Sequence, residues 1–428
     1  MKDVIAIAIF VGAYVFIATE WVHRVIVALA GASLMLLFKI LDANEAFRSE
    51  AFGIDWNVIF LLLGMMIIVG VLRQTGLFEF LAIWAARRSR GRPFAVMTLL
   101  VLITAVASAL LDNVTTILLI APVTVLIAER LGAPAVPFII AEVMASNIGG
   151  TATLVGDPPN ILIGSAADLS YTDFIVNLGP LVLILLVVFV GLSRWLFRDA
   201  LVFHPERVQE VMSLDPKEAL VPGALLRQSL GVLAIVTLGF VLQEAIGYEP
   251  SVVALLGAGV LLLVGPSHLD DVLREVEWGT LLFFMGLFVM VGGLVKVGVI
   301  EELAEFLIDV TGGDLLVATV VLVLLSAVLS GIVDNVPYVA TMVPLVGALA
   351  AQLPGDTTVL WWALAIGADL GGNATSIGAS ANVVALGVAE RSGFKIRFGQ
   401  FLRYGLPTVA VTLAISLLYL WIRYFALA

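Results

Sequence analysis

Cysteine is absent from this chain of 428 residues, and histidine occurs only three times. The lack of thiols excludes disulfides, thiolate metal sites and cysteine nucleophiles together. His23, His204 and His268 fall in predicted loops and are too scattered for a metal cluster. No GxxxxGK[ST] sequence occurs, so the chain carries no ATP-binding loop of that kind. We therefore predict no enzymatic centre, no metal site and no cofactor.

Charge is also scarce: 13% of the residues are charged and 61% are hydrophobic, whereas soluble domains are about one quarter charged. Apolar residues do not alternate with period two, which excludes a strand barrel. Several apolar runs are long enough, or nearly so, to cross a bilayer core of about 30 Å as helices. These runs cover residues 4–19, 24–41, 56–72, 174–197, 228–246, 250–265, 278–295 and 401–422. The sequence predicts an all-α polytopic membrane protein.

The first apolar run is predicted to be a retained helix. It lacks a small-residue cleavage site, and a second span follows at once, which is not the pattern of a signal peptide.

Sequence features recur along the chain at a fixed offset of 222 residues. Trp56 matches Trp278, and the Asp112-Asn113 pair matches Asp334-Asn335. The same offset aligns "GGTATLVGDPPN" (149–160) with "GGNATSIGASAN" (371–382). We predict a first transmembrane repeat over residues 1–200 and a second over 225–428. The polar, proline-containing stretch 201–224 is predicted to be a solvated cytoplasmic linker.

Each repeat contains an apolar pair that lacks the polar loop expected of an outside turn. In the first repeat the arms are residues 94–111 and 113–130, and Asp112 interrupts them. This pattern predicts a re-entrant hairpin, whose non-helical tip is tolerated where it is buried or lines a cavity. Residues 135–166 are too long for one simple span and carry glycine and proline pairs, so we predict two half-helices with an unwound centre.

These segments give five crossings in each repeat, about 10 transmembrane helices plus 2 hairpins in all. Because five is odd, the second repeat is predicted to be inverted relative to the first. Most of the 22 Lys and Arg residues, including the "SRGRP" cluster, then lie on the face of loop 73–93. The positive-inside rule makes that face cytoplasmic in a plasma (inner) membrane and places both termini outside.

Polar residues inside the hairpins and broken segments are the candidate binding groups. An aspartate at a bilayer centre costs about 2.5 to 3.5 kcal/mol on insertion scales, so a function must offset it. Two such clusters are expected to meet near the bilayer midplane, as in an alternating-access carrier. The candidate solute- and ion-binding residues are Asp112, Asn113, Thr115, Asn147, Gly149, Thr151, Thr153, Asp157, Asn160, Asp334, Asn335, Asp369, Gly371, Asn373, Thr375, Ser376 and Asn382.

The charges in these two clusters narrow the substrate class. Four aspartates fall within them in the sequence, and no Lys, Arg or His does. An anion would meet unbalanced negative charge. Protons, small cations or a neutral polyhydroxyl solute fit better than a carboxylate.

The motifs "ALLDNVTTILLIAPVT", "SNIGGTATLVGDPPNILI" and "DNVPYVATMVP" resemble those of the ion transporter superfamily, in its arsenite efflux permease and sodium/proton antiporter branch with a citrate-transporter-like domain. The resemblance implies an inverted-repeat fold and an elevator-like movement of the hairpins. In sodium-coupled carboxylate carriers of this superfamily the tips read Ser-Asn-Thr. Here Asn113 and Asn335 match, but Val114 and Val336 replace the third residue, which argues against dicarboxylate transport.

The leading hypothesis is a secondary transporter that couples protons to the efflux of a small neutral metalloid hydroxide, arsenite or antimonite. In it, Asp112 and Asp334, together with Asp157 and Asp369, carry the proton. A sodium/proton antiporter built on the same aspartates is the alternative.

Two other classes fit less well. An intramembrane aspartyl protease would need a glycine where Val155 stands, and a passive channel would conduct far faster than a carrier. The expected partners are a small inorganic solute, a coupling proton or sodium, and the lipid bilayer, with no nucleic acid. A homodimer and a separate ATPase subunit stay open.

Overall fold

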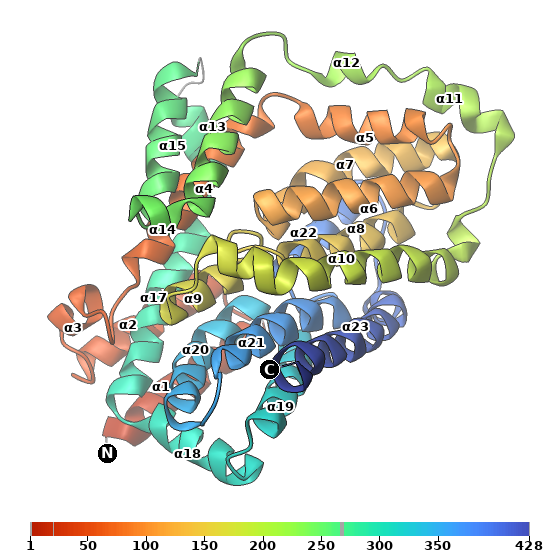
Figure 1. Cartoon of the computed structure of the whole chain (residues 1–428). Coiled ribbons are helices and arrows are strands. Elements are labelled where there is room, and N and C mark those ends of the chain that lie inside the picture. Colours follow the sequence, from red (N-terminus) through yellow and green to blue (C-terminus); the bar gives the residue numbers. More distant parts are fainter. Residues whose placement is uncertain (1, 20, 266–268, 428) are drawn as a thin grey trace.

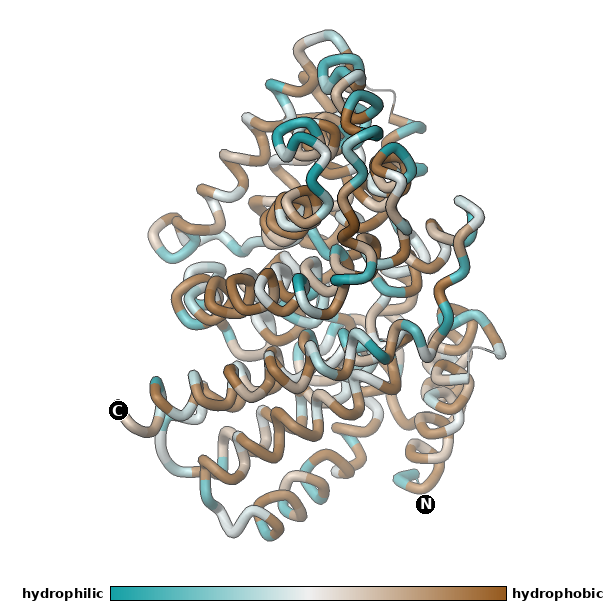
Figure 2. Tube along the Cα trace, turned by 90° about the vertical axis from the view of Figure 1, so that its right-hand side faces the viewer, coloured by the Kyte–Doolittle hydropathy of each residue, from teal (hydrophilic) through white to brown (hydrophobic). Residues whose placement is uncertain are grey.

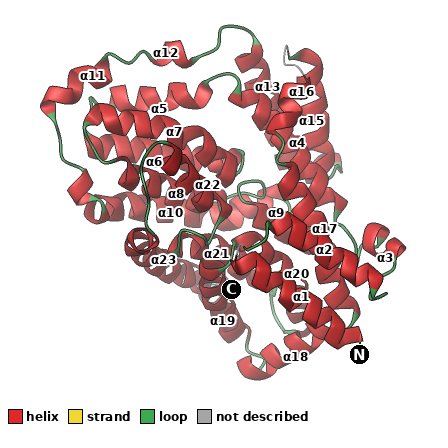
Figure 3. Cartoon of the chain, turned by 180° about the vertical axis from the view of Figure 1, so that it is seen from behind, coloured by secondary structure: helices red, strands yellow, loops and turns green. Residues whose placement is uncertain are grey.

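The computed structural model describes residues 2–19, 21–265 and 269–427; His268, one of the predicted loop histidines, lies outside them. Within these residues every regular element is a helix (Figure 1, Figure 3). Eight of these helices are long and apolar enough to cross a membrane. They are α1 (Lys2–Thr19), α4 (Trp56–Arg73), α6 (Pro93–Leu110), α7 (Asn113–Leu131), α10 (Tyr171–Leu196), α17 (Trp278–Lys296), α19 (Leu315–Ile332) and α23 (Phe398–Trp421).

Four further apolar helices are shorter: α2 (Arg24–Leu37), α8 (Ala135–Gly150), α13 (Leu225–Val241) and α15 (Pro250–Val264). Figure 2 shows that apolar residues dominate the helices, whereas hydrophilic residues gather in the connections and at helix ends. The remaining helices are α3 (Ala43–Arg48), α5 (Leu77–Arg88), α9 (Pro158–Ala167), α11 (Val208–Met212), α12 (Pro216–Ala219), α14 (Gln243–Ile246), α16 (Leu269–Glu275), α18 (Val299–Thr311), α20 (Asn335–Gln352), α21 (Thr358–Gly371) and α22 (Ser380–Arg391).

Equivalent helices of the two repeats make equivalent contacts. Helix α6 packs along α8, and α19 packs along α21 in the same way. A side chain on Gly149 would place its Cβ 2.3 Å from the Ala105 carbonyl oxygen, and one on Gly371 would lie 2.6 Å from that of Ala327. Only glycine permits these close backbone approaches. The 222-residue offset therefore reflects duplicated packing as well as duplicated sequence.

Helices of one repeat also pack against helices of the other repeat. Helix α2 packs along α17 of the other repeat, and α15 packs along α4. Gly286 lies against the backbone of Ala28, and Gly64 lies against the backbone of Ala254. Helix α9 packs on α20, and α22 packs on α7, near the middle of the molecule (Figure 1). This interlocking brings residues of both repeats to one central region.

The helix breaks fall where the sequence places them. Helix α6 ends at Leu110 and α7 begins at Asn113, while α8 and α9 are separated by residues 151–157. Asp112 caps α7 by accepting a hydrogen bond from the Thr115 backbone N–H at 2.7 Å. Asp334 caps α20 by accepting one from the Val336 backbone N–H at 3.1 Å. Each aspartate thereby satisfies a backbone donor at the start of its helix.

The linker, residues 201–224, is mostly exposed or half-buried and touches the first repeat at a few points. It contains the short helices α11 and α12, and α12 packs on α5. Val211 is buried, and the Val221 backbone N–H donates to the Thr75 carbonyl at 3.1 Å. Val211 and the packing of α12 on α5 thus fix parts of the linker against the first repeat.

Candidate transport site

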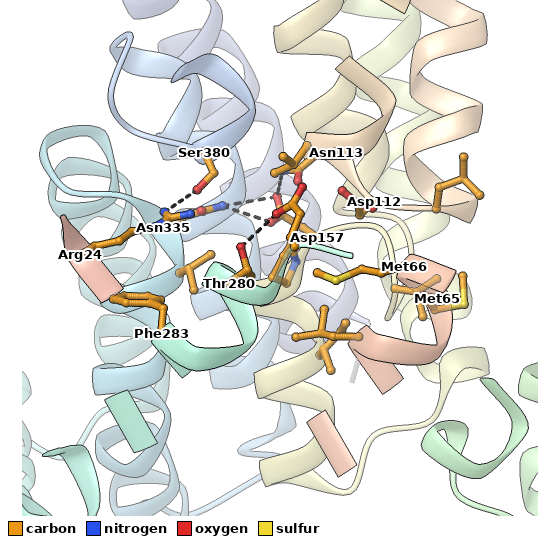
Figure 4. Close-up of a pocket in the computed structure, with 18 residues that line it drawn as sticks. Arg24, Met65, Met66, Asp112, Asn113, Asp157, Thr280, Phe283, Asn335 and Ser380 are labelled. Atoms are coloured by element: carbon orange, nitrogen blue, oxygen red, sulfur yellow. Dashed lines mark hydrogen bonds between the residues drawn. The ribbon is translucent and has the colours of Figure 1, made fainter. Parts of the chain in front are cut away.

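One carboxylate joins the starts of α7 and α20. Asp157, which precedes α9, accepts a hydrogen bond from Asn113 Nδ2 at 2.6 Å. Asn335 Nδ2 lies 3.3 Å from both oxygens of the same carboxylate. All three residues are at most 2% exposed. Figure 4 shows Asp157 between the two asparagines, so the Asp-Asn pairs of the two repeats converge on a single acidic group.

A chain of amides extends this contact between the repeats. Asn113 Nδ2 also lies 3.1 Å from Asn147 Oδ1. Asn147 Nδ2 in turn donates to Asn373 Oδ1 at 2.9 Å and to Asn382 Oδ1 at 3.2 Å. These side chains are buried, where an amide is stable only with its partners in place.

Asp369 occupies the position equivalent to Asn147, but its surroundings are different. It is fully buried, and neither carboxylate oxygen has a hydrogen-bond partner among the described residues. Thr151 and Asn160 lie beside it. The Thr151 hydroxyl already donates to the Asn147 carbonyl at 2.9 Å. The Asn160 amide also donates to the carbonyls of Gly150 and Thr153, so both neighbouring donors are shared with backbone carbonyls.

Other predicted residues hold the unwound segments in place. Thr153 donates to the Ala109 carbonyl at 2.5 Å, and Thr375 donates to the Gly331 carbonyl at 2.6 Å. Asn382 donates to the carbonyls of Gly372 and Thr375, as Asn160 does in the first repeat. The donors of these side chains bind backbone carbonyls of their own repeat, while Asn382 also accepts from Asn147 of the first repeat.

Four predicted positions make no such side-chain link among the described residues. Gly149 and Gly371 act through close packing. Thr115 meets Asp112 through its backbone N–H. Ser376 is buried in the unwound segment of the second repeat.

A small chamber of about 40 Å³ lies beside Asp157 and the two asparagines. Because about 10 to 15 Å³ of this kind of space holds one water, the chamber has room for a few water molecules or a small solute. Met65, Met66 and Phe283 also line it. Their sequence context predicts packing alone, yet the structure places them around the chamber. A wider cavity of about 470 Å³ adjoins it, bordered by Asp334 and His23.

Arg24 corrects the expectation that no basic residue lies in the clusters. Its guanidinium Nη1 lies 3.0 Å from Asp334 Oδ2 and 3.0 Å from Ser380 Oγ. Arg24 begins α2, and the packing of α2 on α17 carries it to the second repeat. In the sequence, Arg24 was counted only among the positive charges that set the membrane orientation, so this contact was not predicted. Ser380, in turn, donates to Asp334 Oδ2 at 2.5 Å.

A further carboxylate, Glu277, was also missed by sequence reasoning. It precedes α17, accepts a hydrogen bond from the Thr280 hydroxyl at 2.9 Å, and lines both cavities. Its equivalent by the 222-residue offset is Asp55, which caps α4. The sequence could have indicated Glu277, because an acidic residue directly precedes the matching tryptophan in both repeats.

The known proteins that this chain resembles are transporters or membrane proteins. A family model described as citrate transporter matches residues 14–367. The chain is 53% identical over 428 residues to an uncharacterized transporter of Mycobacterium tuberculosis, covering 99% of each chain. It is 49% identical over 428 residues to the 46 kDa membrane protein of Mycobacterium leprae, covering all of both. It is 34% identical over 502 residues to the human P protein, covering 98% of this chain and 60% of that one.

Solved transporters share the fold. MtrF of Neisseria gonorrhoeae, from a class of antimetabolite efflux pumps, aligns with a TM-score of 0.64 at 13% identity, covering 96% of this chain and 95% of that one. The YdaH transporter of Alcanivorax borkumensis aligns with a TM-score of 0.56 at 17% identity, covering 95% of this chain and 98% of that one. The family model, the relatives and the apolar helices together show a multi-pass membrane protein and a secondary transporter. The chain belongs to the citrate transporter family of the ion transporter superfamily.

Proposed function

We propose that the chain is a proton-coupled efflux carrier for a small neutral metalloid hydroxide, arsenite or antimonite. The observation that carries the proposal is the Asp369 carboxylate, which is fully buried without a hydrogen-bond donor. A buried carboxylate is stable only when it holds a proton or a cation or accepts hydrogen bonds. A protonated Asp369 has its own donor, and Asn160 Oδ1 beside it is a buried acceptor without a partner.

The chemistry of the unmatched atoms supports a hydroxylic solute. Asn113 Oδ1, which borders the chamber, is buried and accepts no hydrogen bond from a described residue. Asp157 supplies further acceptor capacity beside it. A neutral trihydroxide brings three O–H donors and no charge, so it suits a chamber that is rich in acceptors.

The charge balance still disfavours an anion after Arg24 is included. Three carboxylates line the chamber, those of Asp112, Asp157 and Glu277, and Asp334 lines the adjoining cavity. Asp369 interacts electrostatically with Asp157, and the one guanidinium that lines the chamber, that of Arg24, already pairs with Asp334. A tricarboxylate such as citrate is also far larger than the chamber of about 40 Å³. Small size and negative surroundings together favour a neutral solute and a coupling cation.

A sodium/proton antiporter is the second candidate, and the same atoms favour it. Hard cations such as sodium bind carboxylate and amide oxygens. The unpartnered oxygens of Asp369 and Asn160 are of this type. The two proposals differ in the solute that moves when the acidic pair exchanges its proton.

The membrane arrangement is part of the same proposal. The repeats, residues 1–200 and 225–428, are inverted in the plasma membrane with both termini outside, and linker 201–224 is cytoplasmic. The hairpins are re-entrant and move as in an elevator. The odd number of predicted crossings and the positive charges on the face of loop 73–93 support this arrangement.

The test uses purified protein in proteoliposomes with an acidic lumen. Outward proton movement is expected to drive arsenite into the lumen above the outside concentration. A protonophore is expected to abolish the accumulation, and protein-free liposomes give the leak. Accumulation no greater than in protein-free liposomes, or unchanged by the protonophore, would contradict the proposal. A pH change in the lumen on sodium addition, with no response to arsenite, would support the antiporter instead.

A further inference from the structure

We infer that Arg24 is a tethered cation that latches the second Asp-Asn tip to α2 and α17, and that a coupling cation must displace it from Asp334. The inference rests on the proposed cation-coupled transport and adds a positioning residue to it. The contacts are specific: Arg24 Nη1 lies 3.0 Å from both Asp334 Oδ2 and Ser380 Oγ. The guanidinium carbon also lies 5.3 Å from the centre of the Phe283 ring.

The latch joins the α2–α17 pair to the starts of α20 and α22, in addition to the packing of α17 on α20. Arg24 is on α2 and Phe283 is on α17, and these two helices lie backbone to backbone where Gly286 meets Ala28. Asp334 and Ser380 belong instead to the starts of α20 and α22. Any movement of the second tip relative to the α2–α17 pair must therefore break the ion pair.

Both Asp334 oxygens are already occupied. Oδ1 accepts the Val336 backbone N–H at 3.1 Å, and Oδ2 receives Arg24 and the Ser380 hydroxyl. A cation approaching this carboxylate competes directly with the guanidinium, because both require the same oxygen. Binding of a cation to Asp334 therefore also releases Arg24 from this carboxylate.

Arg24 also lies at the opening between the two cavities. Arg24, Val114, Glu277 and Ser380 line both the small chamber and the wider cavity. Figure 4 shows the arginine on the side of Asn335 away from Met65 and Met66. Because the latch and the opening share these residues, displacement of Arg24 changes the access of solute to the chamber.

The first tip has no equivalent latch. The 222-residue offset would place a partner for Asp112 near Ile246, and α15, the counterpart of α2, begins with Pro250. Among the described residues no ion pair involves Asp112. An ion pair holds the aspartate of one tip and not that of the other, so the latch favours one of the two conformations that an alternating-access carrier visits.

The other ionisable groups near Asp334 do not replace the arginine. Glu277 and Asp157 are acidic, and His23 is the residue before Arg24 on the wall of the wider cavity. Tyr14 of α1 contacts the start of α20 through the Pro337 carbonyl and Thr341. Arg24 is the one strong cation among these groups.

The absence of cysteine makes the test direct. A single cysteine replaces Ile377, which is partly exposed and lines the wider cavity, and its labelling rate by a maleimide is measured in proteoliposomes without solute. The substitution Arg24→Gln is expected to change the rate about fivefold, because a partly exposed ion pair shifts a two-state equilibrium by roughly that factor. Arg24→Lys, which keeps the charge, is expected to have a smaller effect.

The matched control is Arg73→Gln, which removes the ion pair between Arg73 and Glu275, two residues that line neither the chamber nor the wider cavity, and it is expected to leave the rate unchanged. The double exchange Arg24→Asp with Asp334→Arg is expected to restore the wild-type labelling rate but not coupled transport. An unchanged rate in Arg24→Gln, or an equal change in Arg73→Gln, would overturn the latch. The labelling assay contains no arsenite, so it tests the latch separately from the proposed function. Normal arsenite accumulation together with an unchanged labelling rate in Arg24→Gln would refute the latch and leave the proposed function standing.

Discussion

The two Asp-Asn tips share a backbone design but differ in their charges. In both repeats the aspartate caps a helix and the asparagine reaches Asp157. The second tip alone is paired with an arginine. Asp157 itself has no acidic counterpart, because Ala379 stands at the equivalent position. The duplication has preserved the scaffold, while the ionisable groups have become specific to one repeat.

This difference assigns separate tasks to equivalent positions. Asn147 of the first repeat links amides across the centre, whereas neither carboxylate oxygen of Asp369, at the matching position, has a well-aligned hydrogen-bond partner among the described residues. A strictly symmetric site would hold two identical binding groups. The observed site holds one shared acid, one isolated acid and one paired acid, which is suited to binding a cation and a neutral solute together.

The largest expected effect comes from removing the shared acid. Asp157→Ala leaves the amides of Asn113 and Asn335 without their acceptor in a buried place. Because hydrogen bonds to a charged group contribute about 1.5 to 3 kcal/mol each, transport is expected to fall at least about tenfold. Initial rates in proteoliposomes measure the change, and thermal unfolding in detergent checks that the protein is folded. Transport at the wild-type rate would show that the convergence is not functional.

A second prediction compares the two asparagines. Asn113 makes the shorter contact with Asp157, 2.6 Å against 3.3 Å for Asn335, and it also contacts Asn147. Asn113→Ala is therefore expected to reduce transport about tenfold and Asn335→Ala about threefold, in line with the loss of one strong or one weak hydrogen bond. Transport rates of the two variants, measured in parallel, show which asparagine matters more. A larger loss of transport in Asn335→Ala than in Asn113→Ala would contradict the prediction.

A third prediction concerns the duplicated packing. Gly149→Ala places a Cβ 2.3 Å from the backbone oxygen of Ala105, so helices α6 and α8 must separate. Overpacking of this kind costs about 1 to 3 kcal/mol, and Gly371→Ala in the second repeat is expected to cost a similar amount. Thermal unfolding in detergent measures both. Gly191→Ala is the control, since nothing lies within 4 Å of its added Cβ; equal stability in all three variants would contradict the packing account.

The smallest expected effect lies on the surface. Lys296 contacts both carboxylate oxygens of Glu45 at 2.5 Å, and this hydrogen bond lowers the pKa of Glu45 below its ordinary value, assisted by the Asp42 backbone N–H. A lowered pKa stabilises the fold at pH values above the ordinary pKa of the carboxyl, and the contribution is lost as the pH falls through the lowered value.

Lys296→Met is therefore expected to reduce the unfolding temperature slightly at neutral pH and not at strongly acidic pH. The difference is small because the pair is partly exposed to solvent. Melting curves across a pH series measure it. A constant difference at every pH would assign the effect to lost packing of the lysine stem.

Local pattern predicted much of the fold. The boundaries of the arms of the first Asp-Asn pair follow to within one residue from the apolar runs and from the aspartate between them. The 222-residue offset identified the equivalent positions, including the glycines that meet Ala105 and Ala327. These features depend on residues near one another in the chain or on a visible repeat.

The contacts of the site depend on packing between distant segments. Asn335 and Asp157 are far apart in the sequence, and Arg24 reaches Asp334 only because α2 packs on α17. A charge count along the chain therefore assigned Arg24 to the surface. The same limit applied to Thr153 and Thr375, whose hydroxyls bind backbone carbonyls of their own repeats.

The most direct test of the central claim is the dependence of arsenite accumulation on a proton gradient in Asp369→Asn. The amide has its own N–H donors and imitates the protonated acid, so the variant is expected to fold normally. It is also expected to equilibrate arsenite across the membrane without accumulating it, while wild-type protein accumulates it. Gradient-driven accumulation at the wild-type level in Asp369→Asn would contradict the account.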